Sequence, residues 1–183
     1  CERPELKEDI MLREYPIEQL ARSTETRFQL GFAKMVAYCL PSFDDAALQP
    51  TVDGLQILGA NEMALDAPRE MIRKLHQADV ALQEPRVRLL RREGDLHEPV
   101  MCVRACVHGG AVEGAIHELV RRGAAIESVN WLHAPVVVRA SGRLRDLLGY
   151  PAEFAALSNG CGDLKMWLSH YAPVPPGPED LAA

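Results

Sequence analysis

Cys102, Cys106 and His108 are the residues of this sequence whose types could bind a metal or attack a substrate. They lie in a segment, residues 100–108, where apolar and polar residues alternate as in a β-strand. Four residues of strand span about 13 Å, so Cys102 and Cys106 cannot both reach one ion at metal–sulfur distances of about 2.3 Å. Cys106 and His108 could form a nucleophile–base pair, but no orienting carboxylate or oxyanion donor is evident beside them. The spacing therefore favours neither a metal site nor a catalytic residue.

Two tryptophans and a basic strip could serve a different chemistry, the binding of nucleic acid. Trp131 and Trp167 could stack on bases, although both fall in predicted strands, where core or interface packing is the competing interpretation. The basic strip comprises Arg69, Arg73, Lys74, Arg86, Arg88, Arg91 and Arg92, opposed only by Glu70, Asp79 and Glu84. It could contact phosphates or form a solvated charged face.

The composition is that of an ordinary globular chain. Its 183 residues are 48% hydrophobic and 25% charged. The net charge of −6 does not favour nucleic-acid binding in bulk, although the charge is unevenly spread, and no DNA partner is expected. No apolar run reaches the ~18 residues of a membrane span and no signal peptide opens the chain, so we expect a cytoplasmic location and no membrane contact. Five irregularly spaced cysteines fit a reducing compartment. Cys1 indicates a processed or longer parent chain, or a lipoprotein.

The C-terminal half shows a clear order of elements. A strand over residues 100–108 precedes a helix with Val112, Ile116, Leu119 and Val120 on its apolar side, which ends at Gly123. Strands over 125–132 and 135–140, a helix near 143–157 and a strand over 164–171 follow. This β-α-β-β-α-β order predicts a ferredoxin-like sandwich, in which both helices cover one face of an antiparallel sheet.

The N-terminal half is less regular. Pro16 is expected to open an amphipathic helix of about five turns, over residues 17–36. Residues 41–50 are expected to form a loop or irregular strand, and residues 51–58 a short strand interrupted by Asp53-Gly54. A second helix should begin at Asp66-Ala67-Pro68 and stop by Pro85, before a short exposed strand over 86–90.

Five motifs of the C-terminal half occur in the order and spacing found in the last domain of elongation factor G, which this part of the chain resembles over about 75 residues. They are Glu98-Pro99-Val100-Met101, Arg121-Arg122-Gly123, Leu148-Gly149-Tyr150, Ser158-Asn159-Gly160-Cys161-Gly162 and Ser169-His170-Tyr171-Ala172-Pro173-Val174-Pro175.

The upstream part resembles the preceding domain of that family, domain IV, less closely. Asn61-Glu62-Met63-Ala64-Leu65 and Leu82-Gln83-Glu84-Pro85 are similar to family segments after the tip loop and at the domain junction. The Glu-Pro pair recurs at Glu98-Pro99, so about 14 residues look inserted. The family's tip-loop histidine is absent from Gln56-Ile57-Leu58, and Cys161 replaces a loop arginine.

The resemblance implies an α+β chain with three parts. Residues 1–97 would form a partial α/β domain resembling domain IV together with a linker, and residues 98–175 would form the ferredoxin-like sandwich resembling domain V. Residues 176–183 would be a tail.

For function, the resemblance implies a ribosome-binding region that contributes to translocation or ribosome protection by docking on ribosomal RNA and proteins. The contact candidates are the basic strip together with Arg121, Arg122, Arg139, Arg143 and Arg145, and the tip-loop candidates are Gln56, Ile57 and Leu58. GTP and magnesium would belong to a GTPase domain, whose phosphate-binding loop this sequence lacks, so no cofactor is expected on this chain. Whether the whole protein is an enzyme stays open.

Two other interpretations of function remain. A ferredoxin-like small-molecule sensor or small enzyme would need an apolar pocket with convergent polar groups. A degenerate remnant of a translation factor would have no function of its own.

Overall fold

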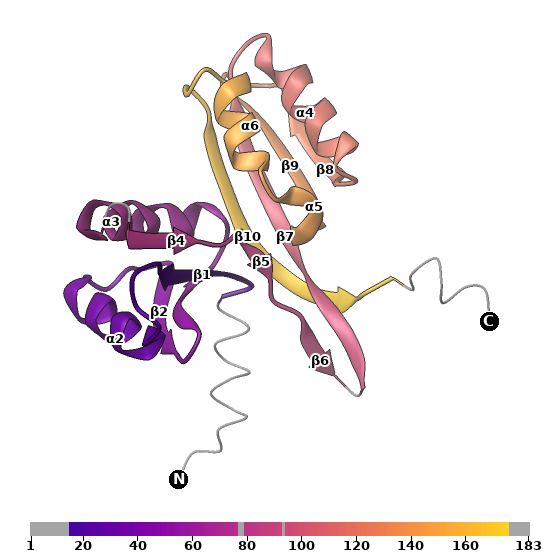
Figure 1. Ribbon diagram of the computed structural model, residues 1–183. Coiled ribbons are helices and arrows are strands. Elements are labelled where there is room, and N and C mark those ends of the chain that lie inside the picture. Colours follow the sequence, from indigo (N-terminus) through magenta and orange to yellow (C-terminus); the bar gives the residue numbers. More distant parts are fainter. Residues whose placement is uncertain (1–14, 77–78, 93, 176–183) are drawn as a thin grey trace.

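Two antiparallel sheets form the framework of the computed structural model, which describes residues 15–76, 79–92 and 94–175 (Figure 1). The first sheet has the strand order β2-β3-β1-β4, with β5 also paired to β1. The second has the order β10-β7-β9-β8, with β6 also paired to β7. Within the described ranges, no helix is long and apolar enough to cross a membrane. Cys1 and the expected tail over 176–183 lie outside these ranges.

The first sheet carries two helices and one 3₁₀ turn. Its strands are β1 (Ile17–Ser23), β2 (Ala46–Thr51), β3 (Gly54–Gly59), β4 (Val80–Leu82) and β5 (Arg86–Val87). Its helical elements are α2 (Gln29–Cys39), the 3₁₀ turn η1 (Met63–Leu65) and α3 (Asp66–His76).

The helix expected from Pro16 is wrong in its first half, because residues 17–23 form the central strand β1. Ile17, Gln19 and Ala21 alternate on the buried side of this strand, which pairs with β3, β4 and β5. The Ser23 hydroxyl accepts hydrogen bonds from the backbone N–H groups of Glu25 and Thr26, which turns the chain before α2. Apolar residues four apart fit a strand as well as a helix, so the expected single helix is a strand, a turn and a shorter helix.

Strands β2 and β3 form a hairpin, so of the loop or irregular strand expected over 41–50 the second part is strand. Pro50 is tolerated because β2 is an edge strand of the first sheet. The hairpin closes where Thr51 pairs with Gly54, whose φ of +143° is a conformation that residues with a side chain rarely adopt. The Asp53-Gly54 turn signal is therefore confirmed.

The apparently inserted segment continues both sheets. Helix α3 begins at Asp66 as expected and ends at His76, well before Pro85. Strand β4 pairs with β1, and after the interruption at Glu84-Pro85 strand β5 pairs with β1 as well. Strand β6 (Leu90–Arg92) then forms a hairpin with the start of β7 (Asp95–Val107). In Figure 1 this hairpin projects from the lower end of the second sheet.

The second sheet is a ferredoxin-like sandwich, as expected. Its remaining elements are α4 (Ala111–Arg121), β8 (Ala125–Asn130), β9 (Val136–Arg143), α5 (Leu144–Leu147), α6 (Tyr150–Leu157) and β10 (Asp163–Pro173). The order β10-β7-β9-β8 places the first and last strands of the motif side by side. Helices α4 and α6 cover the same face of the sheet (Figure 1).

Strand β7 separates the two faces of this sheet as its alternation predicts. Met101, Val103, Ala105 and Val107 are buried under the helices. Arg104 and its alternating neighbours therefore lie on the opposite, helix-free face, which we call the open face. The α+β class and the sandwich are thus confirmed.

Two details of the helices differ from expectation. Val120 is 55% exposed, and Ala115 instead packs into the core beside Leu119. The helix expected near 143–157 is two helices, because Leu148 leaves the helical conformation with ψ 132° and Gly149 adopts a left-handed conformation with φ +80° between α5 and α6. A left-handed residue cannot continue a right-handed helix.

We predict that Gly54→Ala destabilises the β2–β3 hairpin. A Cβ at residue 54 would lie 2.4 Å from the Ala21 carbonyl oxygen, and the φ of +143° disfavours any side chain. The expected loss in the free energy of unfolding is about 2 kcal/mol, measured by urea denaturation. Gly110→Ala is the control, since a Cβ there meets no atom within 4 Å. Equal stability of the two variants would contradict this account of the hairpin.

Candidate functional site

The structure divides the sequence-predicted contact residues into cations that are buried within the protein and cations that are exposed. Arg69 donates to the Gln19 side-chain oxygen at 2.5 Å and to Asp66 at 2.9 Å. Arg88 pairs with Glu18 at 3.4 Å and donates to the Tyr15 carbonyl. These two members of the basic strip are largely buried and fasten local structure.

Arg143 and Arg145 both pair with Glu98, the glutamate of the second Glu-Pro motif. Glu98 is only 1% exposed, and its carboxylate contacts Arg143 Nη1 and, at 3.2 Å, Arg145 Nε. Arg143 also donates to the Pro173 carbonyl at 3.2 Å. A buried carboxylate needs such partners, so Arg143 serves the fold first, while Arg145 keeps a half-exposed side chain.

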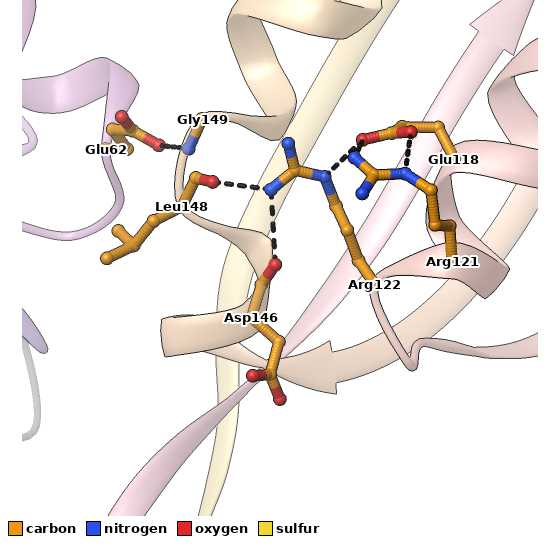
Figure 2. Close-up of polar contacts among 7 residues, drawn as sticks. All are labelled: Glu62, Glu118, Arg121, Arg122, Asp146, Leu148 and Gly149. Carbon is orange, nitrogen blue, oxygen red and sulfur yellow. Dashed lines mark hydrogen bonds and ion pairs between the residues drawn. The ribbon is translucent and has the colours of Figure 1, made fainter.

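The neighbours Arg121 and Arg122 have different roles, although both contact Glu118. Arg121 is 60% exposed and, among the described residues, contacts Glu118 alone, at 2.6 Å. Arg122 is 14% exposed, contacts Glu118 at 2.6 Å and donates to the carbonyls of Leu148 at 2.5 Å and Asp146 at 3.2 Å. Figure 2 shows its guanidinium between α4 and the α5–α6 turn. Of these two contact candidates, Arg121 is therefore exposed, whereas Arg122 is used inside the protein.

The α5–α6 turn is also bound by residues that follow strand β3 of the first sheet. The Glu62 carboxylate accepts a hydrogen bond of 2.6 Å from the Gly149 N–H, as Figure 2 shows. Asn61 donates to the Met166 carbonyl of β10 at 2.9 Å and accepts from the Ala64 N–H of η1. The Asn-Glu-Met-Ala-Leu, Arg-Arg-Gly and Leu-Gly-Tyr motifs, far apart in the sequence, therefore meet at one junction.

The remaining contact candidates are exposed. They are Arg73 and Lys74 on α3, Arg86 on β5, Arg91 and Arg92 on β6, Arg121 on α4, Arg139 on β9 and Arg145 on α5. Lys74 is paired with Glu70 at 2.6 Å across one helical turn. Exposed ion pairs of this kind are weak, so Glu70 would hinder the binding of a phosphate to Lys74 only slightly.

The tip-loop candidates are not in a loop. Gln56, Ile57 and Leu58 lie within β3, where Ile57 and Leu58 are fully buried and Gln56 donates to Glu18 at 2.5 Å. The exposed tip of the hairpin is Val52-Asp53 instead. The expectation is wrong because the Asp-Gly pair completes the turn, and the chain re-enters the sheet at Gly54.

The cysteine and tryptophan candidates differ in exposure. Cys106 is buried on β7 while His108 is exposed beyond its end, and the described residues contain no group of three or more His, Cys, Asp or Glu side chains placed to hold a metal. Trp131 and Trp167, for which core or interface packing was the competing interpretation, are 58% and 45% exposed.

Charge at the junction is set by Glu118. Hydrogen bonds from Arg121 and then Arg122 lower the pKa of its carboxyl to about 2. The same contact raises the pKa of Arg121. Burial, followed by the charge of Glu118, raises the pKa of Tyr150 above its ordinary value. Glu118 therefore stays ionised far into the acid range and keeps both arginines in place.

Sequence reasoning missed Glu62, Glu98 and Glu118, the carboxylates that hold the arginines and the turn. It also missed Arg104 and Lys165 as possible contact residues. The alternation in β7 predicts which face Arg104 occupies, but only the strand register shows which residues lie beside it. Glu62 does belong to the motif Asn-Glu-Met-Ala-Leu, but the sequence does not show that its partner is the Gly149 N–H.

We predict that Arg122→Ala costs about 2 kcal/mol of unfolding free energy, because it removes charge-assisted hydrogen bonds to two carbonyls and a carboxylate. Arg121→Ala should cost much less, since its side chain is exposed and has one partner in the described part of the chain. Thermal and urea unfolding of the two single variants tests this difference. Equal losses would show that Arg122 is not the residue that fastens the turn.

We also predict an acid-dependent contribution from Glu118. Its folded pKa of about 2 lies below the ordinary value of 4.5, so its contribution is complete above about pH 5 and is lost as the pH falls toward 2. Glu118→Gln should therefore be less stable than wild type at neutral pH, with a gap that narrows below pH 5. Unfolding free energies across this range test it, and a gap that stays constant with pH would contradict it.

Comparison with known proteins agrees with this fold. Residues 95–181 match the family model described as "Elongation factor G C-terminus". A solved structure, the crystal structure of ttk003000868 from Thermus thermophilus, superposes with a TM-score of 0.62 at 15% identity, covering 96% of this chain and 44% of that chain. At this identity the likeness is one of fold, and this chain spans less than half of that protein. No curated protein matches the sequence. Residues 95–181 are therefore similar to the C-terminus of elongation factor G, which relates this part of the chain to translation factors.

Proposed function

We propose that this chain is the ribosome-binding C-terminal region of an elongation factor G-like translation factor. The observation that carries the proposal is the family match over residues 95–181, set within a fold likeness that extends over 96% of the chain. On this proposal the chain acts by docking. The chemistry of GTP and magnesium belongs to a GTPase domain of the whole factor, because no phosphate-binding loop occurs in this sequence.

Exposed cations support docking on ribosomal RNA. Arg91 and Arg92 extend from the β6–β7 hairpin, whose strand β6 lies within the apparently inserted segment. Arg86 on β5 and Arg73 on α3 are also exposed. Contacts of this kind would go to phosphates, which position a protein on RNA without reading its sequence.

The proposal predicts salt-sensitive co-sedimentation of the full chain with ribosomes. Each neutralised phosphate contributes about 0.7–0.9 to the slope of log affinity against log salt. Arg91→Ala combined with Arg92→Ala should therefore weaken binding and flatten the slope by about 1.4–1.8. The matched control is Arg27→Ala with Lys34→Ala, which removes two exposed charges from the first sheet's loop and α2.

Binding is measured at two salt concentrations, with folding checked by circular dichroism. Loss of affinity in the hairpin variant, with the control unchanged, supports docking through this hairpin. A folded wild-type chain that stays in the supernatant at low salt would overturn the proposed function.

A further inference from the structure

Three cations stand in a row across the open face of the second sheet. Arg104 on β7 lies directly opposite Arg139 on β9 and, on its other side, directly opposite Lys165 on β10. Residues opposite one another on adjacent strands have Cβ atoms about 5 Å apart, and like charges in such positions destabilise a sheet. Nothing in the core requires this arrangement, because the helices cover the other face. We call Arg139, Arg104 and Lys165 the cation row.

The cation row is only partly neutralised. Arg104 pairs with the exposed Asp163 at 3.2 Å. Within the described part of the chain, Arg139 and Lys165 form no ion pair. Ser128 lies opposite Arg139 at the β8 end of the row. Uncompensated positive charge on a chain of net charge −6 indicates that this surface meets an anion.

Aromatic side chains flank both ends of the row. On one side, a groove of about 610 Å³ is lined by Arg104, Arg139, Ser128, Asn130, Trp131 and Leu132. On the other side, Trp167 lies two residues along β10 from Lys165, on the same face, opposite Cys102. Both tryptophans are about half exposed, so their ring faces are accessible on the surface that carries the charges.

We propose that the open face of the second sheet binds single-stranded RNA. The cation row would hold the phosphates, and Trp131 and Trp167 would stack on unpaired bases. Duplex RNA offers phosphates but no free base faces, whereas a single strand offers both. The proposal deepens the proposed function and rests on it for the source of the RNA, an unpaired segment of ribosomal RNA.

Two variants of the full chain test the proposal, with a labelled single-stranded RNA of about ten mixed-sequence nucleotides, within the usual site size of such surfaces, as the probe. Arg139→Gln combined with Lys165→Gln should reduce the salt slope of binding by about 1.4, at about 0.7 per phosphate contact for single strands. Trp131→Ala should weaken binding by about 5- to 150-fold, the range of one stacked base. Fluorescence anisotropy at low and near-physiological salt measures both.

The matched control is Arg27→Gln with Lys34→Gln, which should bind the probe like wild type. Because the two replaced cations of the row have no ion-pair partners among the described residues, the row variant should unfold at the same temperature as wild type or above it. A folded row variant that binds the probe like wild type would overturn the proposal. Equal affinity of wild type for a duplex of the same sequence, or full competition by polyglutamate, would also overturn it.

Ribosome co-sedimentation separates this proposal from the proposed function. If the row variant sediments with ribosomes like wild type, the open face is not the RNA-binding surface, while docking itself stands. If wild type binds the single-stranded probe through the row but not ribosomes, the surface assignment holds and the proposed function fails.

Discussion

The left-handed turn at Gly149 is the constraint on which the arrangement of the two sheets depends. Helix α5 ends where Leu148 leaves the helical conformation, with ψ 132°, and the φ of +80° at Gly149 then turns the chain into α6. The Gly149 N–H and the Leu148 carbonyl bond to side chains from other parts of the fold. The Glu62 carboxylate accepts a hydrogen bond from the Gly149 N–H, and the Arg122 guanidinium donates one to the Leu148 carbonyl. Because buried backbone groups must be paired, one turn fixes the end of α4, the α5–α6 corner and the position of η1 together.

The sequence predicts the second sheet well because its signals are local. Strict alternation identifies β7, and glycines mark the ends of helices and turns. The first sheet is harder, since Ile17 and Ala21 lie four residues apart and suit one face of a helix as well as one face of a strand. Residues 17–23 form a strand because they pair with β3, β4 and β5. These partners are distant in the sequence, and no local pattern predicts their register.

The candidate site was predictable by residue type but not by role. A run of arginines indicates a possible phosphate surface, yet Arg122 and Arg143 are used by partners 26 and 45 residues away. Conversely, Arg104 and Lys165 are unremarkable in the sequence, separated by most of a domain. They become neighbours only through the register of β7 with β10. The chemistry of an arginine thus depends on which acceptors the fold brings to it.

The hydrogen bond between Asn61 and β10 also affects how readily copies of this protein associate with one another. Strand β10 is an outer strand of its sheet, and an outer strand offers unpaired carbonyl and N–H groups to any extended segment. The Asn61 amide occupies the Met166 carbonyl in the middle of β10, and η1 lies beside it. The contact that joins the two sheets therefore also protects β10 against strand addition, the first step of aggregation in crowded solution.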